Sequence, residues 1–188
     1  MRVPAKQRIL DTASRLFAER GYSEVGINEI IEKSGTAKAT FYHHFPSKEA
    51  LCEAWLLSMH DRSEVNRQNI INSDGPVAEK VVTYFQGLRD YLKNNEFRGC
   101  PFSNTAAVCT DEESTICRHV EDHKLGIRDF FRDLASEFTA TGARAREIGD
   151  VLFVLYSGAS VEAQNLKAMW PVDAAIQAAR EICERENC

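Results

Sequence analysis

The residues with the most informative chemistry lie between positions 27 and 45, where two short helix-patterned stretches flank Gly35-Thr36-Ala37. A tight glycine-containing turn between two short helices is the arrangement of a helix-turn-helix, whose second helix enters the major groove of DNA. The second stretch contains Tyr42-His43-His44. An aromatic core cluster is one interpretation, but three successive side chains cannot all face inward on a helix. We therefore expect at least one of them on the DNA-facing surface.

The sequence around this motif resembles the tetracycline-repressor family. Residues 36–51 resemble the family's recognition region, and residues 9–13 and 16–22 resemble its first helix. The resemblance is dense over residues 6–51, whereas the remainder is similar only in its helix pattern. It implies a homodimer that binds a palindromic operator in double-stranded DNA, represses transcription and releases the DNA when a small-molecule inducer binds.

The resemblance implies two sets of DNA contacts. The groove-facing residues of the recognition helix are Lys38, Thr40 and His43. The phosphate contacts are Tyr42 and Lys48, a role that suits a phenol hydroxyl and an ammonium group at the edge of the helix.

Three further positions complete this interpretation. Phe41 and Phe45 are expected to pack beneath the recognition helix. Gly26 departs from the family, many of whose members have Thr or Ser there to cap the second helix and contact phosphate. Glycine caps only through its backbone, so we expect no side-chain phosphate contact at this position.

The elements that must position these residues are helical throughout. The spacing of apolar residues and of Gly and Pro breaks predicts helices over residues 6–20, 27–34, 38–44, 48–72, 77–93, 101–109, 111–139, 143–167 and 172–185. We expect an all-α fold with a three-helix DNA-binding domain over residues 1–46 and a helical ligand-binding and dimerisation domain over residues 47–188.

The two C-terminal helices, 143–167 and 172–185, are expected to pair with those of a second copy in a four-helix interface. Leu152, Val154, Leu155 and Ala159 support this, because so many apolar residues are unusual on an exposed face.

Charge is unevenly distributed along the 188 residues, whose net charge is -5. Residues 1–50 carry eight Lys and Arg against six Asp and Glu, whereas the remainder carries 15 against 22. Only residues 1–50 need to approach the phosphates of DNA. Repulsion between DNA and the acidic remainder could help orient residues 1–50 toward the duplex. No apolar run approaches the ~20 residues of a membrane span, and the N-terminus lacks an apolar signal region. We expect a cytoplasmic protein that does not engage membranes.

The six cysteines suggest an alternative signal. The segment from Arg98 to Phe102 resembles a Gly-Cys-Pro-Phe signature in a subset of the family, some of whose members sense oxidants or electrophiles through cysteine. With Pro101 opening a helix, Cys100 lies at its N-terminus and Cys109 near its end, and a helix N-terminus favours the thiolate. These two are the candidate redox residues. The alternative is that they are small packing residues, since cysteine is commonly buried. Cys183 and Cys188 are expected to have no role.

A pocket for an inducer requires apolar lining between helices. Tyr84, Phe85, Phe102, Phe130 and Tyr156 are the candidate lining residues, although such residues at helical spacing also form ordinary core.

Enzymatic and metal sites have little support. The sequence contains no nucleophile elbow and no phosphate-binding loop, so we do not expect an enzyme or a cofactor. Cys117, His119 and His123 lack a further ligand at recognisable spacing, and we expect both histidines on a solvated face. The remaining alternative is a helical binding module or enzyme that does not bind DNA.

Overall fold

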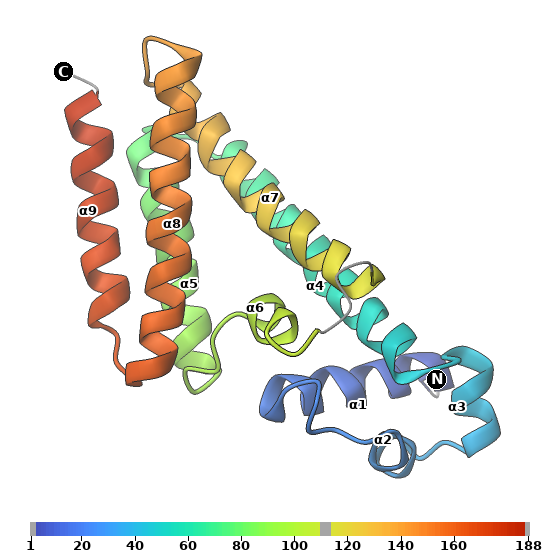
Figure 1. The fold of residues 1–188 in the computed structure, drawn as a ribbon. Helices are drawn as coiled ribbons and strands as arrows, with labels where there is room; N and C mark the ends of the chain where they lie inside the picture. Colours follow the sequence, from blue (N-terminus) through green and yellow to red (C-terminus); the bar gives the residue numbers. More distant parts are fainter. Residues whose placement is uncertain (1–2, 110–113, 187–188) are drawn as a thin grey trace. The chain divides into compact units, whose positions relative to one another are not determined.

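The computed structural model describes residues 3–109 and 114–186, and all regular structure within them is α-helical (Figure 1). The helices are α1 (Ala5–Arg20), α2 (Ile27–Ser34), α3 (Lys38–His44), α4 (Lys48–Ile71), α5 (Val77–Asn94), α6 (Pro101–Ala106), α7 (Thr115–Ser136), α8 (Gly142–Leu166) and α9 (Trp170–Glu186). The expected all-α fold class is confirmed. Among the described helices, none is both long and apolar enough to cross a membrane.

Helix bounds follow the sequence pattern except around α6 and at the end of α7, which was expected at residue 139 and lies at Ser136. Helix α6 was expected to reach residue 109 but ends at Ala106. The amides of Val108 and Cys109 donate to carbonyl oxygens only three residues back, at 3.2 and 3.1 Å, so the chain tightens into turns. The start expected for the next helix, at residue 111, lies outside the described residues, and α7 then runs unbroken through Gly126.

The chain divides into two compact units. The first comprises residues 1–61 and 101–121, and the second comprises residues 62–100 and 122–188. The sequence predicted a boundary between a DNA-binding domain ending at residue 46 and a ligand-binding domain starting at residue 47. This division by function stays a prediction.

The first unit is organised around α1. Its apolar stripe, Ile9, Ala13, Leu16 and Phe17, is fully buried as the three- and four-residue spacing predicts. Both α2 and α3 pack against this helix, so burial of the α1 stripe holds the two short helices in place.

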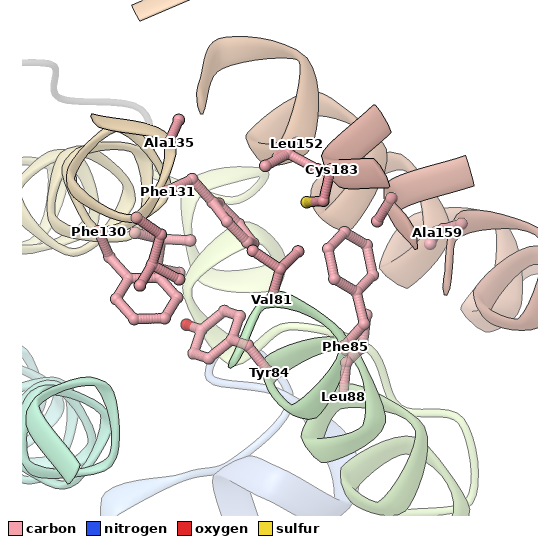
Figure 2. Packing of buried hydrophobic residues seen from close by; sticks show 14 of the residues in the cluster. Val81, Tyr84, Phe85, Leu88, Phe130, Phe131, Ala135, Leu152, Ala159 and Cys183 are labelled. Carbon is pink, nitrogen blue, oxygen red and sulfur yellow. The ribbon is translucent and has the colours of Figure 1, made fainter. Parts of the chain in front are cut away.

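In the second unit α9 packs against α5 and α8 (Figure 1). Helix α9 buries Val172, Ala175, Ala179 and Cys183, residues small enough to let helices approach closely. Figure 2 shows the shared core, in which Val81 and Phe85 of α5 lie among residues of α7, α8 and α9. Burial of this apolar surface is the main source of stability for the unit.

The residues expected at a dimer interface on α8 divide into two groups. Leu152 and Ala159 are buried in the core of their own unit, with 0% and 6% of their surface exposed. The assignment of these two residues to an exposed interface was therefore wrong, because this face of α8 packs against other helices of its own chain. Val154 is 66% exposed, and Leu155 is half-buried against the core.

Helices α7 and α8 pass very close to each other at Gly149. A Cβ atom at this position would lie 2.6 Å from Arg132 Cα and 2.7 Å from Arg132 N. Beside it, the Asp150 carboxylate accepts hydrogen bonds from Arg128 and Arg132 at 2.7–3.0 Å. These bonds hold the pKa of Asp150 well below its usual range. The missing side chain and the ion pairs together fix the contact of α7 with α8.

We predict that Gly149→Ala lowers the free energy of unfolding by about 1–3 kcal/mol, because the added methyl meets backbone that cannot move aside. Gly87→Ala is the matched control, since a Cβ at Gly87 in α5 meets nothing within 4 Å. It should be neutral or stabilising by up to about 1 kcal/mol. Urea unfolding of both variants measures this, and equal stabilities would contradict the close approach.

Candidate nucleic-acid interface

Helix α3 has one buried face and one exposed face. Phe41 and Phe45 are 0% and 3% exposed, as expected for residues beneath the helix. Lys38, Tyr42 and His43 are exposed. The helix therefore presents an ammonium, a phenol and an imidazole, groups that can hydrogen bond to phosphate oxygens or base edges.

The other positions of α3 are less open. Thr40 and His44 are half-buried, and the rings of His43 and His44 lie edge to face with centroids 5.0 Å apart. Lys38 makes no ion pair with any described residue, so its charge is not offset by a carboxylate. By contrast, Glu29 of α2 pairs with Arg20 and Lys33 at 2.5 and 2.8 Å, which lowers the pKa of Glu29 to about 2.

The turn before α3 is shaped by Gly35. This residue adopts φ 60° and ψ 40°, the left-handed conformation that glycine tolerates without strain. The amide of Thr36 then donates to the Ile31 carbonyl at 3.2 Å, and the hydroxyls of Ser34 and Thr36 are 2.8 Å apart. The turn thereby ends α2 and redirects the chain into α3.

Arg8 of α1 fixes the end of α2. Its guanidinium donates to the carbonyl oxygens of Val3, Ser34 and Gly35 at 3.0–3.2 Å. Helix C-termini leave such carbonyls without partners in the helix, and a cation there is favourable. Arg8 was not predicted from the sequence to have this role. Its position, one step from the buried Ile9 on the α1 stripe, was the available signal.

Lys48 is held at the start of α4. Its ammonium donates to the Ser23 carbonyl at 3.3 Å and lies 4.4 Å from the centroid of the Tyr22 ring. Partial burial lowers the pKa of Lys48. The Tyr22 hydroxyl donates to Glu49 at 3.1 Å. Lys48 is thus an oriented cation rather than a flexible one, which suits the phosphate contact predicted for it.

At Gly26 the structure agrees with the expected departure from the family. This residue is the N-cap of α2, with φ -88° and ψ 149°, and no side chain caps the helix. Any anion contact there is left to the backbone amides of α2.

Four of the five predicted pocket residues lie together in the second unit. The Tyr84 ring centroid is 4.6 Å from that of Phe130 and 4.9 Å from that of Tyr156, and Phe85 is 5.5 Å from Tyr156. Phe102 is buried in the first unit. The four rings form a packed aromatic cluster in the core, and their role as a ligand pocket stays a prediction.

A separate surface groove of about 570 Å³ lies in the second unit, lined by Gln86, Arg89, Asp90, Lys93, Phe97 and Met169. None of the predicted pocket residues lines it. Its walls combine charged side chains of α5 with two apolar side chains from the loops.

The two candidate redox cysteines are both half-buried. Cys100 Sγ is 3.6 Å from Lys124 Nζ, and Cys109 Sγ is 3.1 Å from Ser114 Oγ. Cys183 is buried in the core of the second unit, and Cys188 lies outside the described residues.

The histidines considered for metal binding are not arranged as expected. His123 is 5% exposed and His119 is half-buried, so the solvated face expected for them was wrong. Helix α7 turns His123 inward because it follows Ile116 and Val120 at helical spacing. Within the described residues, no group of three His, Cys, Asp or Glu side chains could hold a metal ion.

Comparison with known proteins agrees with this geometry. Residues 9–55, from α1 into α4, match the sequence model described as "Bacterial regulatory proteins, tetR family". The chain is 30% identical over 122 residues to the HTH-type transcriptional regulator YxaF of Bacillus subtilis, covering 62% of this chain and 63% of that relative. That match spans less than two thirds of the relative's length. The HTH-type transcriptional repressor NemR of Escherichia coli is 21% identical over 94% of this chain and 92% of its own.

Solved structures show the same fold. A TetR-family transcriptional regulator from Streptomyces coelicolor superposes with a TM-score of 0.89 at 24% identity, over 98% of this chain and 96% of its own. The reduced form of Escherichia coli NemR gives a TM-score of 0.81 at 20% identity, over 95% and 97%. The chain therefore has the fold of tetR-family regulators. The expectation that it is not an enzyme agrees with these relatives, which are named as transcriptional regulators.

We predict that Lys48→Ala weakens binding to all duplex sequences alike and reduces the slope of log affinity against log salt by about one, as loss of a single phosphate contact should. Lys93→Ala, an exposed lysine in the second unit, is the control for the change in net charge. Fluorescence anisotropy across a salt series measures both. Unchanged affinity with an altered base preference would instead place Lys48 in the groove.

Proposed function

We propose that the protein is a homodimeric transcriptional repressor of the tetR family that binds a palindromic operator and is released by a small-molecule inducer. The observation that carries the proposal is α3, a short helix anchored by Phe41 and Phe45 that exposes Lys38, Tyr42 and His43. Lys38, Thr40 and His43 would read bases, while Tyr42 and Lys48 would contact phosphates.

A second copy of the chain is the expected partner of α8. Val151, Val154 and Val161 are 49%, 66% and 41% exposed, and their spacing places them on one side of the helix together with Gly158. A Cβ at Gly158 would meet nothing within 4 Å, so this side is open in the single chain. A continuous apolar strip of this kind is costly to leave in water, and pairing across a two-fold axis would cover it in both copies.

Release by an inducer follows from linkage. An inducer that binds better to a form with misplaced recognition helices must weaken DNA binding, and DNA must weaken inducer binding by the same factor. The aromatic cluster of Tyr84, Phe85, Phe130 and Tyr156 in the second unit is the proposed inducer site.

We predict that the protein protects a palindromic site in which the two half-sites are separated by one helical turn, about 34–36 Å, or a multiple of it. This spacing lets two recognition helices enter major grooves on one face of the duplex. Footprinting on the DNA upstream of its own gene tests the prediction. Protection of a single unpaired half-site would contradict the dimeric arrangement.

We also predict that Val154→Glu converts the dimer to a monomer at micromolar concentration, because it would place two carboxylates in the apolar interface. Operator affinity should fall at least tenfold, since each half-site is then bound alone. Val65→Glu is the control, because Val65 is 61% exposed on α4. Sedimentation analysis gives the oligomeric state, and a Val154→Glu variant that remains dimeric would place the interface elsewhere.

A second candidate function is favoured by one contact. Lys124 Nζ lies 3.6 Å from Cys100 Sγ, and a cation beside a thiol is the surrounding typical of reactive cysteines. In this alternative the signal is modification of Cys100 or Cys109 by an oxidant or electrophile. The added bulk would not be absorbed smoothly by the packed surroundings.

For this candidate, N-ethylmaleimide should release operator DNA by forming a thioether at the sulfur, the thiol proton passing to the maleimide carbon through solvent. Cys100→Ser or Cys109→Ser should block release while leaving operator affinity unchanged. Cys117→Ser, another half-buried thiol, is the control. A mobility-shift assay of operator binding by the parent chain and the three variants, with and without the reagent, measures release. Release that persists in both test variants would exclude the thiol signal and leave a reversible ligand.

A further inference from the structure

Tyr22 lies in the loop between α1 and α2, directly after the glycine that ends α1. Its ring packs edge to face on Phe17 of α1, with centroids 5.6 Å apart, and the Phe17 centroid is in turn 5.2 Å from that of Trp55 in α4. Three rings thus connect the end of α1 to α4 within the first unit. Tyr22 is half-buried, and it was not predicted from the sequence to have a role of its own.

The face of the Tyr22 ring carries the Lys48 ammonium. Lys48 Nζ lies 4.4 Å from the ring centroid and donates to the Ser23 carbonyl at 3.3 Å. An ammonium over a tyrosine face is attracted by the negative face of the ring. The ring and the carbonyl belong to neighbouring residues of one loop, so this loop holds a cation that belongs to α4.

A cation at this place needs such support, because Lys48 is the first residue of α4. The amides at a helix N-terminus carry partial positive charge, which disfavours an ammonium in the first turn. Partial burial also disfavours the charge and lowers the pKa of Lys48. Among the described residues, no carboxylate forms an ion pair with Lys48. An anion that reached Lys48 would therefore meet both an unpaired ammonium and the N-terminus of α4.

The acid next to Lys48 in the chain, Glu49, is engaged by other groups. Its carboxylate accepts a hydrogen bond from the Tyr22 hydroxyl at 3.1 Å. Its own backbone amide and the Ser47 hydroxyl also donate to it, and these bonds together lower the pKa of Glu49. Burial raises the pKa of Tyr22, so the phenol stays protonated at neutral pH and keeps this donor. The hydroxyl thus fixes the far end of the ring whose face holds Lys48.

We propose that Tyr22 is a positioning residue for the contact of Lys48 with DNA phosphate, because its ring face holds the ammonium in place before DNA binds. The inference rests on the proposed function and adds to it a residue that acts through Lys48. A lysine has a flexible stem, and ordering it on binding costs free energy that a pre-positioned side chain does not lose again. Removal of the ring should therefore weaken DNA binding although the charge of Lys48 remains.

A double-mutant cycle separates positioning from a general loss of stability. We suggest fluorescence anisotropy of the full chain at low salt with a labelled duplex of mixed sequence, since a phosphate contact does not depend on base sequence. Tyr22→Leu should weaken binding about three- to tenfold, the range expected for one flexible side chain that must be ordered on binding. In a Lys48→Ala background, Tyr22→Leu should have no further effect.

Two controls complete the cycle. Lys93→Ala removes an exposed lysine of the second unit, and in this background Tyr22→Leu should keep its full effect. Tyr22→Phe keeps the ring and loses only the hydroxyl, so its affinity should stay within about twofold of the parent. Equal losses from Tyr22→Leu in the Lys48→Ala and Lys93→Ala backgrounds, no loss in the parent chain, or a loss in Tyr22→Phe as large as in Tyr22→Leu would each overturn the proposal.

Proton NMR of the parent chain tests the same contact without relying on a folded Tyr22→Leu variant. Protons held over the face of an aromatic ring are shifted upfield by the ring current. The ε-methylene protons of Lys48, assigned by their loss in Lys48→Ala, should therefore lie upfield of those of the other lysines, and the shift should persist in Tyr22→Phe. Lys48 protons at the ordinary lysine position would overturn the proposal, whatever the variants show.

The same measurements separate this proposal from the proposed function. Absence of any DNA complex with the parent chain would contradict the regulator function and with it the phosphate contact, while an upfield Lys48 signal would still show the ring contact. A DNA complex whose affinity does not depend on the Tyr22 ring would contradict only the positioning role.

Discussion

The recognition surface depends on the burial of Phe41 and Phe45. A helix of seven residues has no stability of its own in water, because nucleation is unfavourable and few hydrogen bonds repay it. Helix α3 therefore exists because Phe41, within it, and Phe45, the residue that ends it, are buried in the first unit, where α3 packs against α1. This anchoring also fixes which residues face outward, since side chains on a helix cannot be rotated independently of its packed face.

Much of this arrangement was predictable from sequence because it depends on local signals. The α1 stripe, the glycine that ends α2 and the inward phenylalanines all follow from helical spacing and from backbone rules for glycine. The outward placement of Tyr42 and His43 follows from the same geometry. Assignment of their roles on DNA came from resemblance to a family, and those roles remain predictions.

The features that escaped prediction depend on contacts distant in sequence. Arg8 reaches the end of α2, 26 residues away, and Arg67 is buried against Gly126 of another helix. Charged residues are rarely buried, so a sequence pattern places them at the surface by default. The apolar content of α8 was evident from the sequence. Which of its apolar residues face the core, as Leu152 and Ala159 do, and which are exposed, as Val154 is, depends on the neighbouring helices.

The most direct test of the central claim, that α3 reads base sequence, is selection of bound duplexes from a randomised pool by the parent chain and by a Lys38→Ala, His43→Ala double variant. The parent should enrich a palindrome, and the variant should lose preference at one or more symmetric pairs of positions while still binding DNA at low salt. Enrichment of the same palindrome by both proteins, or of no sequence by the parent, would contradict it.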